Sequence, residues 1–254
     1  MARIFITGSV DGIGRGAART LIDEGHEVVL HARSAERAKA VADLASRSAG
    51  VVLDDLGSAS ETRALADQVN SIGRMDAVIH NAGIYESANR ADTPEGHART
   101  LAVNTLAPYM LTGLIDRPAR LVYISSGLHR GGSASLRDID WIERRWDGGR
   151  AYADSKLYVA ALALALARRW PSVLSHAVDP GWVPTKMGGR RAPDDLEMGH
   201  LTQTWLATSN DPEARVSGGY WFHRKRQQPA PEALDPGFQD QLLERLADVT
   251  GVAL

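Results

Sequence analysis

Short apolar runs alternate with amphipathic stretches along most of the chain. The runs are rich in Val, Ile and Leu with little polar alternation, which is typical of parallel strands buried on both faces. They predict strands at Arg3–Ile6, Glu27–Leu30, Val51–Leu53, Ala77–His80, Leu121–Ile124, Val173–Val178 and Tyr220–Phe222. The amphipathic stretches predict helices at Gly14–Glu24, Ala35–Ser46, Ser60–Ile72 and Glu95–Leu114. This alternation predicts an α/β fold built on a doubly wound parallel sheet.

The pattern is broken by one long connection, at about residues 127–150, which carries charged and aromatic residues. Long ordered loops are often functional, so we expect this insertion on the substrate side of a site. Segments at about 182–200 and 224–254 are expected to form a lid and a C-terminal cover. No linker separates any part, and we predict a single domain over residues 1–254.

Composition narrows the function mainly by exclusion. The 254 residues carry a net charge of −2, which gives no field to attract nucleic acid or an anionic membrane. The absence of cysteine excludes disulfides and thiolate metal ligands, and no metal site is predicted. The longest apolar stretch, Leu157–Ala167, is shorter than the roughly 20 residues that span a bilayer. We expect a cytoplasmic protein that acts on a small molecule, with no nucleic-acid or membrane partner.

A glycine-rich segment, Thr7–Gly14, follows the first strand and opens the first helix. Glycines there allow a tight turn and let the backbone approach a pyrophosphate at the helix N-terminus. The alternative is a turn that binds nothing.

Candidate chemistry is carried by Tyr152 and Lys156, which lie four residues apart in the most apolar helical stretch. This spacing puts the phenol and the ammonium on one helix face. A nearby ammonium favours phenolate and makes the tyrosine a useful general acid/base. The alternative is an ordinary surface pair.

The motif Thr-Gly-x-x-x-Gly-Ile-Gly, followed by Tyr-x-x-x-Lys after five strands, resembles the short-chain dehydrogenase/reductase family. The resemblance extends from the glycine segment to about Thr185, and the long connection before Tyr152 is similar to the retinol-dehydrogenase-like branch. It implies a Rossmann-type NAD(P)-binding domain and an oxidoreductase acting on a ketone, an aldehyde or a secondary alcohol. The cofactor contacts that it implies are Gly8, Val10, Asp11, Gly12, Ile13, Gly14, Arg33, Asp55, Leu56, Asn81, Ala82, Gly83, Tyr152, Lys156, Pro180, Gly181, Val183 and Thr185.

The end of the second strand bears on the choice of cofactor. Family members that use NAD carry Asp where this chain has Ala32, and Arg33 follows, suited to a 2′-phosphate. We therefore predict NADP(H), with NAD(H) possible. Asp11 is a departure, because some NADP-preferring relatives have a basic residue there. Arg33 is alternatively a solvated residue at a strand end.

The resemblance also implies a catalytic set of Asn104, Ser126, Tyr152 and Lys156. Ser126 orients the substrate carbonyl, with Ser125 as the alternative, and Asn104 holds a water in a proton relay. Tyr152 protonates the oxygen while NADPH delivers hydride. The competing hypothesis is a catalytically silent NADP sensor or scaffold on the same fold. A sugar epimerase or dehydratase fits less well, since the chain is short for an added sugar-nucleotide domain.

The substrate is expected to be apolar. Candidate pocket residues are Trp141, Trp146, Trp182, Tyr158, Met187 and His129, although His129 fits a loop surface as well. The basic run His223–Arg226 is interpreted as a solvated strand end.

Helices that are apolar on all sides must be buried on both faces. Leu101–Leu114 and Tyr152–Ala167 therefore predict a homodimer or homotetramer built on paired helices. The alternative is that the C-terminal segment, including Phe238–Ala247, covers that face within one chain.

Overall fold

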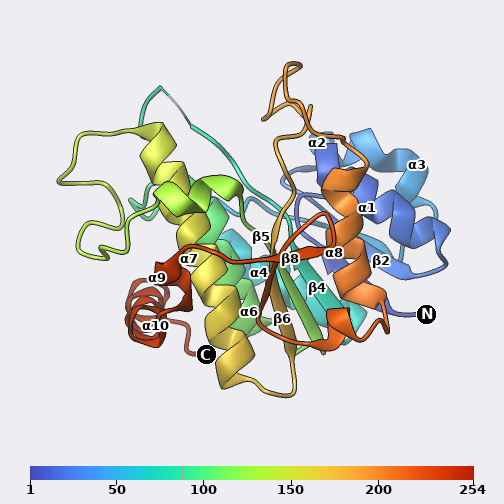
Figure 1. The fold of residues 1–254 in the computed structure, drawn as a ribbon. Coiled ribbons are helices and arrows are strands. Elements are labelled where there is room, and N and C mark those ends of the chain that lie inside the picture. The colour runs from blue at the N-terminus through green and yellow to red at the C-terminus, as the bar shows by residue number, and fades with distance from the viewer. Residues whose placement is uncertain (87) are drawn as a thin grey trace.

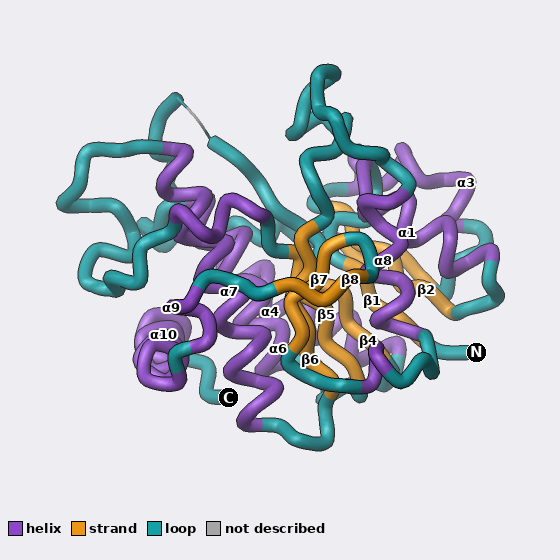
Figure 2. Tube along the Cα trace, viewed as in Figure 1, coloured by secondary structure: helices purple, strands orange, loops and turns teal. Residues whose placement is uncertain are grey.

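The computed structural model describes residues 1–86 and 88–254, and its centre is a single sheet (Figure 2). The strands are β1 (Arg3–Ile6), β2 (Glu27–Ala32), β3 (Gly50–Leu53), β4 (Ala77–His80), β5 (Arg120–Ile124), β6 (Leu174–Asp179), β7 (Gly219–Phe222) and β8 (Lys225–Gln227). Their order is β3-β2-β1-β4-β5-β6-β7-β8, parallel throughout except for the antiparallel pair β7–β8. The doubly wound sheet is confirmed.

Helices cover both faces of the sheet (Figure 1). They are α1 (Gly12–Asp23), α2 (Ala35–Ala38), α3 (Ala42–Ala45), α4 (Ala59–Ile72), α5 (Arg99–Leu101), α6 (Ala107–Leu114), α7 (Gly148–Arg169), α8 (Met198–Thr208), α9 (Pro231–Leu234) and α10 (Pro236–Thr250). Short 3₁₀ segments lie at Lys39–Val41, Gly127–Gly131 and Glu213–Arg215, and a π-helical segment at Ala102–Leu106. In Figure 1, α1 and α8 lie on one side of the sheet and α4, α6 and α7 on the other.

The apolar helix α7 is buried on all sides. One side packs on β5 and β6, and α9 and α10 cover the other. Near α6, the Tyr109 hydroxyl donates to the carbonyl of Val252 at 2.8 Å. The C-terminal segment therefore covers these helices within one chain, as the alternative interpretation expected. The homodimer or homotetramer stays a prediction, but the argument for it no longer applies, because no uncovered apolar face of α7 remains to be buried by a second subunit.

Two predicted helices were wrong in detail. The helix expected from Glu95 begins at Arg99, because residues 93–97 form a turn in which Gly96 has φ +87°. The stretch Ala35–Ser46 divides into α2, a 3₁₀ turn and α3. The basic run at 223–226 makes a hairpin turn and the start of the exposed edge strand β8.

No helix in the described ranges, 1–86 and 88–254, is long and apolar enough to cross a membrane.

Candidate active site

Most of the predicted site residues follow the carboxyl ends of strands β1 to β6, on one edge of the sheet. Strand order reverses between β1 and β4, and open α/β sheets bind ligands in the crevice at such a switch point. The glycine segment follows β1, Asn81–Gly83 follows β4, Ser126 follows β5 and Pro180–Thr185 follows β6.

The loop between β1 and α1 contains two glycines in the left-handed region, Gly8 at φ +64° and Gly12 at +54°. A Cβ on Gly14 would overlap the carbonyl oxygen of Gly8 and the side-chain amide of Asn81. That amide donates to the carbonyls of Thr7 and Gly8 at 3.0 and 3.1 Å, so the end of β4 holds the loop in place.

The start of α1 suits a pyrophosphate. No side chain caps the helix and its first turn has no acidic residue, which leaves backbone N–H groups available to an anion. Val10 is buried in the core between the sheet and α1, and Ile13 packs against it. The residues present therefore fit a dinucleotide.

Asp11 is held by two cations. It forms an ion pair with Arg37 of α2 and another, at 3.0 Å, with Lys186 from the segment after β6. Burial raises the Asp11 pKa, but the hydrogen bonds from Lys186 and Arg37 outweigh burial and hold it below its ordinary value. The negative charge that argues against NADP is therefore offset by its neighbours.

Arg33 is exposed directly after β2, and Arg37 lies one helical turn further along the chain. The end of β2 faces the adenosine ribose in folds of this kind, and both arginines follow it closely in the chain. Arg33 was predicted from the sequence, whereas Arg37 was not. Its partner Asp11 lies 26 residues away in the chain, so no local pattern connects the two residues.

The end of β3 is followed by two of the predicted cofactor contacts, Asp55 and Leu56. Asp55 accepts a hydrogen bond from the amide of Gly57 at 2.8 Å and pairs with Arg99 at 3.0 Å, while Leu56 is buried.

His31 on β2 was missed. Its Nδ1 accepts from the amide of Gly8 at 2.9 Å, and its Nε2 lies 2.9 Å from the carbonyl of Asp54. Burial lowers its pKa, which keeps the imidazole neutral and able to join the glycine loop to the end of β3.

Tyr152 and Lys156 both lie on α7, buried beside the end of β5. The Lys156 ammonium donates to the carbonyl of Ile124 at 2.8 Å and lies 5.5 Å from the centre of the Tyr152 ring. A Cβ on Gly83 would stand 3.2 Å from this ammonium and 3.4 Å from the Asn104 side-chain oxygen. The end of β4 thus passes closely between Lys156 and Asn104, and only glycine leaves that space free.

Asn104 lies within the π-helical segment and is buried. Its oxygen accepts from the amide of Ile84 at 2.8 Å, and its nitrogen donates to the Ile84 carbonyl and the Ser155 hydroxyl, each at 3.0 Å. These bonds fix the amide against the turn after β4. Single π turns inside α-helices are frequent at functional sites.

The two serines after β5 face different surroundings. The Ser125 hydroxyl is buried and donates to the carbonyl of Lys156 at 2.8 Å, so it is occupied in packing. Ser126 is partly exposed, and hydrogen bonding from its side chain lowers the Tyr152 pKa. This arrangement favours Ser126 over Ser125 as the residue facing a substrate.

Burial dominates the ionisation of the central pair. It raises the pKa of Tyr152 to about 12, with the charge of Asp179 and nearby Tyr85 adding to the rise and Ser126 opposing it. Burial lowers the pKa of Lys156 to about 8, and Asp179 opposes that decrease. The phenol is therefore held in its protonated form and is suited to donate a proton.

The segment after β6 closes over this edge. Gly181 has φ +84°, and Asp194 accepts a hydrogen bond from the amide of Trp182 at 2.6 Å. The Thr185 hydroxyl accepts from the amide of Gly188 at 3.1 Å, and its methyl group would be 3.2 Å from a Cβ on Gly12. Pro180–Thr185 therefore lies directly beside the glycine loop, as the predicted cofactor contacts require.

The predicted substrate residues do not form one pocket. Tyr158 and His129 are fully buried packing residues, because His129 accepts from the amide of Ala230 at 2.8 Å and lies 3.2 Å from the Tyr220 hydroxyl. The interpretation of His129 as a surface residue is wrong. Trp182 and Met187 are exposed on the segment after β6, whereas Trp141 and Trp146 line a separate depression.

Two residues near Tyr152 were missed. The Tyr85 ring meets that of Tyr152 edge-on with centroids 5.3 Å apart, and the carboxylate of Asp179 influences both Tyr152 and Lys156. Asp179 directly precedes the predicted cofactor contacts Pro180 and Gly181, and this position in the sequence could have identified it as a site residue.

Comparison with known proteins identifies the family. A family model described as enoyl-(acyl carrier protein) reductase matches residues 8–214. The chain is 42% identical to "Short-chain dehydrogenase chyC" of Penicillium rubens over 100% of this chain and 99% of that one. It is 32% identical to "Putative daunorubicin C-13 ketoreductase DnrU" of Streptomyces, over 98% of this chain and 92% of that one. The chain belongs to the short-chain dehydrogenase/reductase family and is an oxidoreductase.

A solved structure agrees with the fold. A putative uncharacterized protein from Mycobacterium paratuberculosis superposes with a TM-score of 0.85 at 26% identity, covering 100% of this chain and 94% of that one.

Proposed function

We propose that the protein is an NADP-dependent reductase of apolar ketones or aldehydes, with Tyr152 as the proton donor. The observation that carries this proposal is the buried phenol of Tyr152 between Ser126 and the Lys156 ammonium, at the edge where the glycine loop meets the segment after β6. The same residues would oxidise a secondary alcohol in the reverse direction.

When bound, the nicotinamide supplies the hydride that reduces the carbonyl carbon. Ser126 donates a hydrogen bond to the carbonyl oxygen, which stabilises the negative charge that develops there. Tyr152 transfers its proton to that oxygen, so that C=O becomes CH–OH. Lys156 stabilises the resulting phenolate, and a proton from solvent then restores the phenol past Asn104.

The raised pKa of Tyr152, about 12 as a result of burial, supports reduction as the favoured direction near neutral pH. A phenol that keeps its proton is ready to act as an acid, whereas oxidation needs phenolate. The name of one relative, a putative ketoreductase, also supports reduction.

An apolar substrate is supported by exposed side chains on three segments around the site. Tyr85 follows β4, Leu128 follows β5 and Trp182 follows β6, and these three side chains are 45%, 59% and 59% exposed. Burying such side chains against a ligand releases water and is favourable.

The preference for NADP over NAD is supported by Arg33 and Arg37, which follow β2. The last residue of β2 is Ala32, so this position carries no acidic side chain that would repel a 2′-phosphate. Guanidinium groups bind phosphate through charge-assisted hydrogen bonds.

The test is NADPH oxidation by the purified protein with a panel of apolar ketones and aldehydes, beside matched carboxylated compounds. We expect turnover with at least one apolar compound and none in Tyr152→Phe. Tight NADPH binding without turnover of any compound would instead favour a silent sensor on the same fold.

A further inference from the structure

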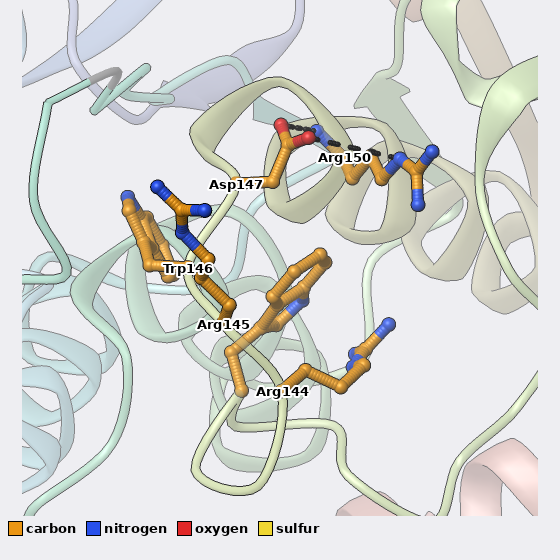
Figure 3. A pocket seen from close by; sticks show the side chains of 6 residues that line it. Arg144, Arg145, Trp146, Asp147 and Arg150 are labelled. Atoms are coloured by element: carbon orange, nitrogen blue, oxygen red, sulfur yellow. Dashed lines mark hydrogen bonds and ion pairs between the residues drawn. The ribbon is translucent and has the colours of Figure 1, made fainter.

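A second depression lies on the connection that leads into α7 (Figure 3). It encloses about 560 Å³ and is lined by Trp141, Arg144, Arg145, Trp146, Asp147 and Arg150. Cavities of this size hold small organic ligands. Neither the glycine loop nor any of the proposed catalytic residues lines it.

The aromatic side chains that line the depression are held by packing and by ion pairs. Trp141 is buried and has φ +55°, a conformation that bulky residues rarely adopt and that clusters at functional sites. Its ring meets Trp146 edge-on at 5.9 Å and carries the Arg144 guanidinium 3.8 Å from its centre. Arg144 is in turn paired with Asp138 at 3.3 Å and Asp154 at 3.4 Å.

The rim of the depression is positively charged. Three arginines and one carboxylate line it, and the charge of Arg144 is already offset by its ion pairs with Asp138 and Asp154. Arg150 is only loosely paired with Asp147, at 3.7 Å, and Arg145 is exposed with no carboxylate partner in the described part of the chain. The indole nitrogen of Trp146 is buried and, within residues 1–86 and 88–254, donates to no acceptor. This leaves the exposed guanidinium groups of Arg145 and Arg150 beside aromatic rings.

The depression faces away from the catalytic cleft. Arg150 lies two residues before Tyr152 on α7, which corresponds to about 200° of rotation around the helix. Asp154, which anchors Arg144, lies two residues after Tyr152 and is turned away by the same angle. A ligand here would therefore contact the connection before α7 and the first turn of that helix, and none of the proposed catalytic residues.

We propose that this depression is a binding site for a flat, apolar-bodied anion such as an aromatic carboxylate. The ring system packs against the parts of Trp141 and Trp146 that line the depression, and the anionic group pairs with Arg145 and Arg150. Both guanidinium groups and tryptophan faces recognise such molecules, through bidentate hydrogen bonds and through stacking.

The test uses 2-naphthoate as the probe, with neutral 2-methylnaphthalene and ring-free acetate as comparisons, and isothermal titration calorimetry on the full chain saturated with NADPH. We expect 2-naphthoate to bind at least about 10-fold more tightly than either comparison compound. The double variant Arg145→Gln/Arg150→Gln should lose that difference. Arg137→Gln is the matched control, because Arg137 is exposed on the same connection but does not line the depression.

Equal affinity for the naphthoate and its neutral analogue would overturn the proposal, as would unchanged binding in the double variant. Displacement of naphthoate by an apolar carbonyl substrate would also overturn it, since the anion would then occupy the catalytic cleft. The comparison of naphthoate with its neutral analogue and the measurement on the double variant require no turnover, so they test the proposal whether or not the proposed reductase activity is found.

Discussion

The carboxylate of Asp179 lies against the α-carbon of Gly127, with one oxygen 3.0 Å from where a Cβ on residue 127 would stand. Its other oxygen accepts from the amide of Gly181 at 3.0 Å. The end of β6 thereby reaches the turn that carries Ser126. After burial, the charge of Asp179 is a cause of raised pKa for Tyr152, and it opposes the decrease that burial causes for Lys156.

Asp179→Asn should shift the pH profiles of both reaction directions downward. Reduction needs protonated Tyr152, so its rate is lost as pH rises through the Tyr152 pKa. Burial and then Asp179 raise that pKa, and removing the carboxylate lowers it. The loss of reduction should then begin at lower pH, and oxidation, which needs phenolate, should begin at lower pH too. Steady-state rates across pH measure both limbs.

The control for this shift is Asp195→Asn, a carboxylate on the segment after β6 that accepts a hydrogen bond from the amide of Met198 at 2.9 Å. Its profile should match that of the wild type. A profile for Asp179→Asn that is unmoved, or moved to higher pH, would contradict the electrostatic role.

Tyr152→Phe should keep NADPH binding near the wild-type value and lower kcat by about 10²–10⁴-fold, the usual contribution of a general acid. The ring still packs against Tyr85, while the proton that neutralises the alkoxide is gone. Fluorescence titration and single-turnover hydride transfer measure the two effects separately. Transfer within a few-fold of wild type would mean that another group donates the proton.

Lys156→Ala should differ from Tyr152→Phe by weakening NADPH binding as well as turnover. Its ammonium is held at the carbonyl of Ile124, beside Gly83 at the end of β4, where the nicotinamide ribose is expected. The same two measurements apply, and unchanged NADPH affinity would argue against this placement of the ribose.

Arg33→Ala should weaken NADPH by about 1.5–3 kcal/mol while NADH binding stays the same, since a charge-assisted contact to the 2′-phosphate is lost. Asp11→Asn is the opposite charge change in the same region, and it should tighten NADPH because Arg37 and Lys186 are released from their ion pairs. Titration of both cofactors into each variant tests the pair. Equal wild-type affinity for NADPH and NADH would refute the NADP assignment.

Light scattering at micromolar concentration distinguishes the predicted homodimer or homotetramer from a monomer, and the cover of α7 by α9 and α10 favours a monomer mass. These helices occupy the face of α7 on which a paired-helix dimer was predicted. A dimer would mean that association uses another surface, and mutating exposed residues of β8 would then be the next comparison.

Local patterns sufficed where one stretch of chain determines the structure. The runs Arg3–Ile6 and Ala77–His80 were predicted with their observed limits, and the glycine loop, Tyr152 and Lys156 come to one edge of the sheet because parallel strands end there. The family resemblance added Asn104 and Ser126, which no local pattern singles out.

Features that depend on distant partners could not be predicted. His31 joins the glycine loop to β3 through contacts 23 residues away on either side, and its sequence context is that of any strand residue. The turn before β8 places His223 and Arg224 at φ 48° and 59°, where glycine or asparagine is the usual signal. The packing of α10 against α7 depends on the path of the C-terminal segment, and the hydrophobic periodicity of the sequence does not specify that path.

The π turn at Ala102–Leu106 makes the number of residues in this segment, and not only their identity, important for the position of Asn104. A π turn contains one residue more than an α-helix needs to span the same rise. Removing a single residue there would restore regular α-helix, with both flanks close to their present orientation but with the side chains inside the turn pointing in new directions. The Asn104 amide would then swing away from Ile84 and Ser155 although every nearby residue type was kept. Among related chains, gaps should therefore be rare in this segment even where substitutions are common.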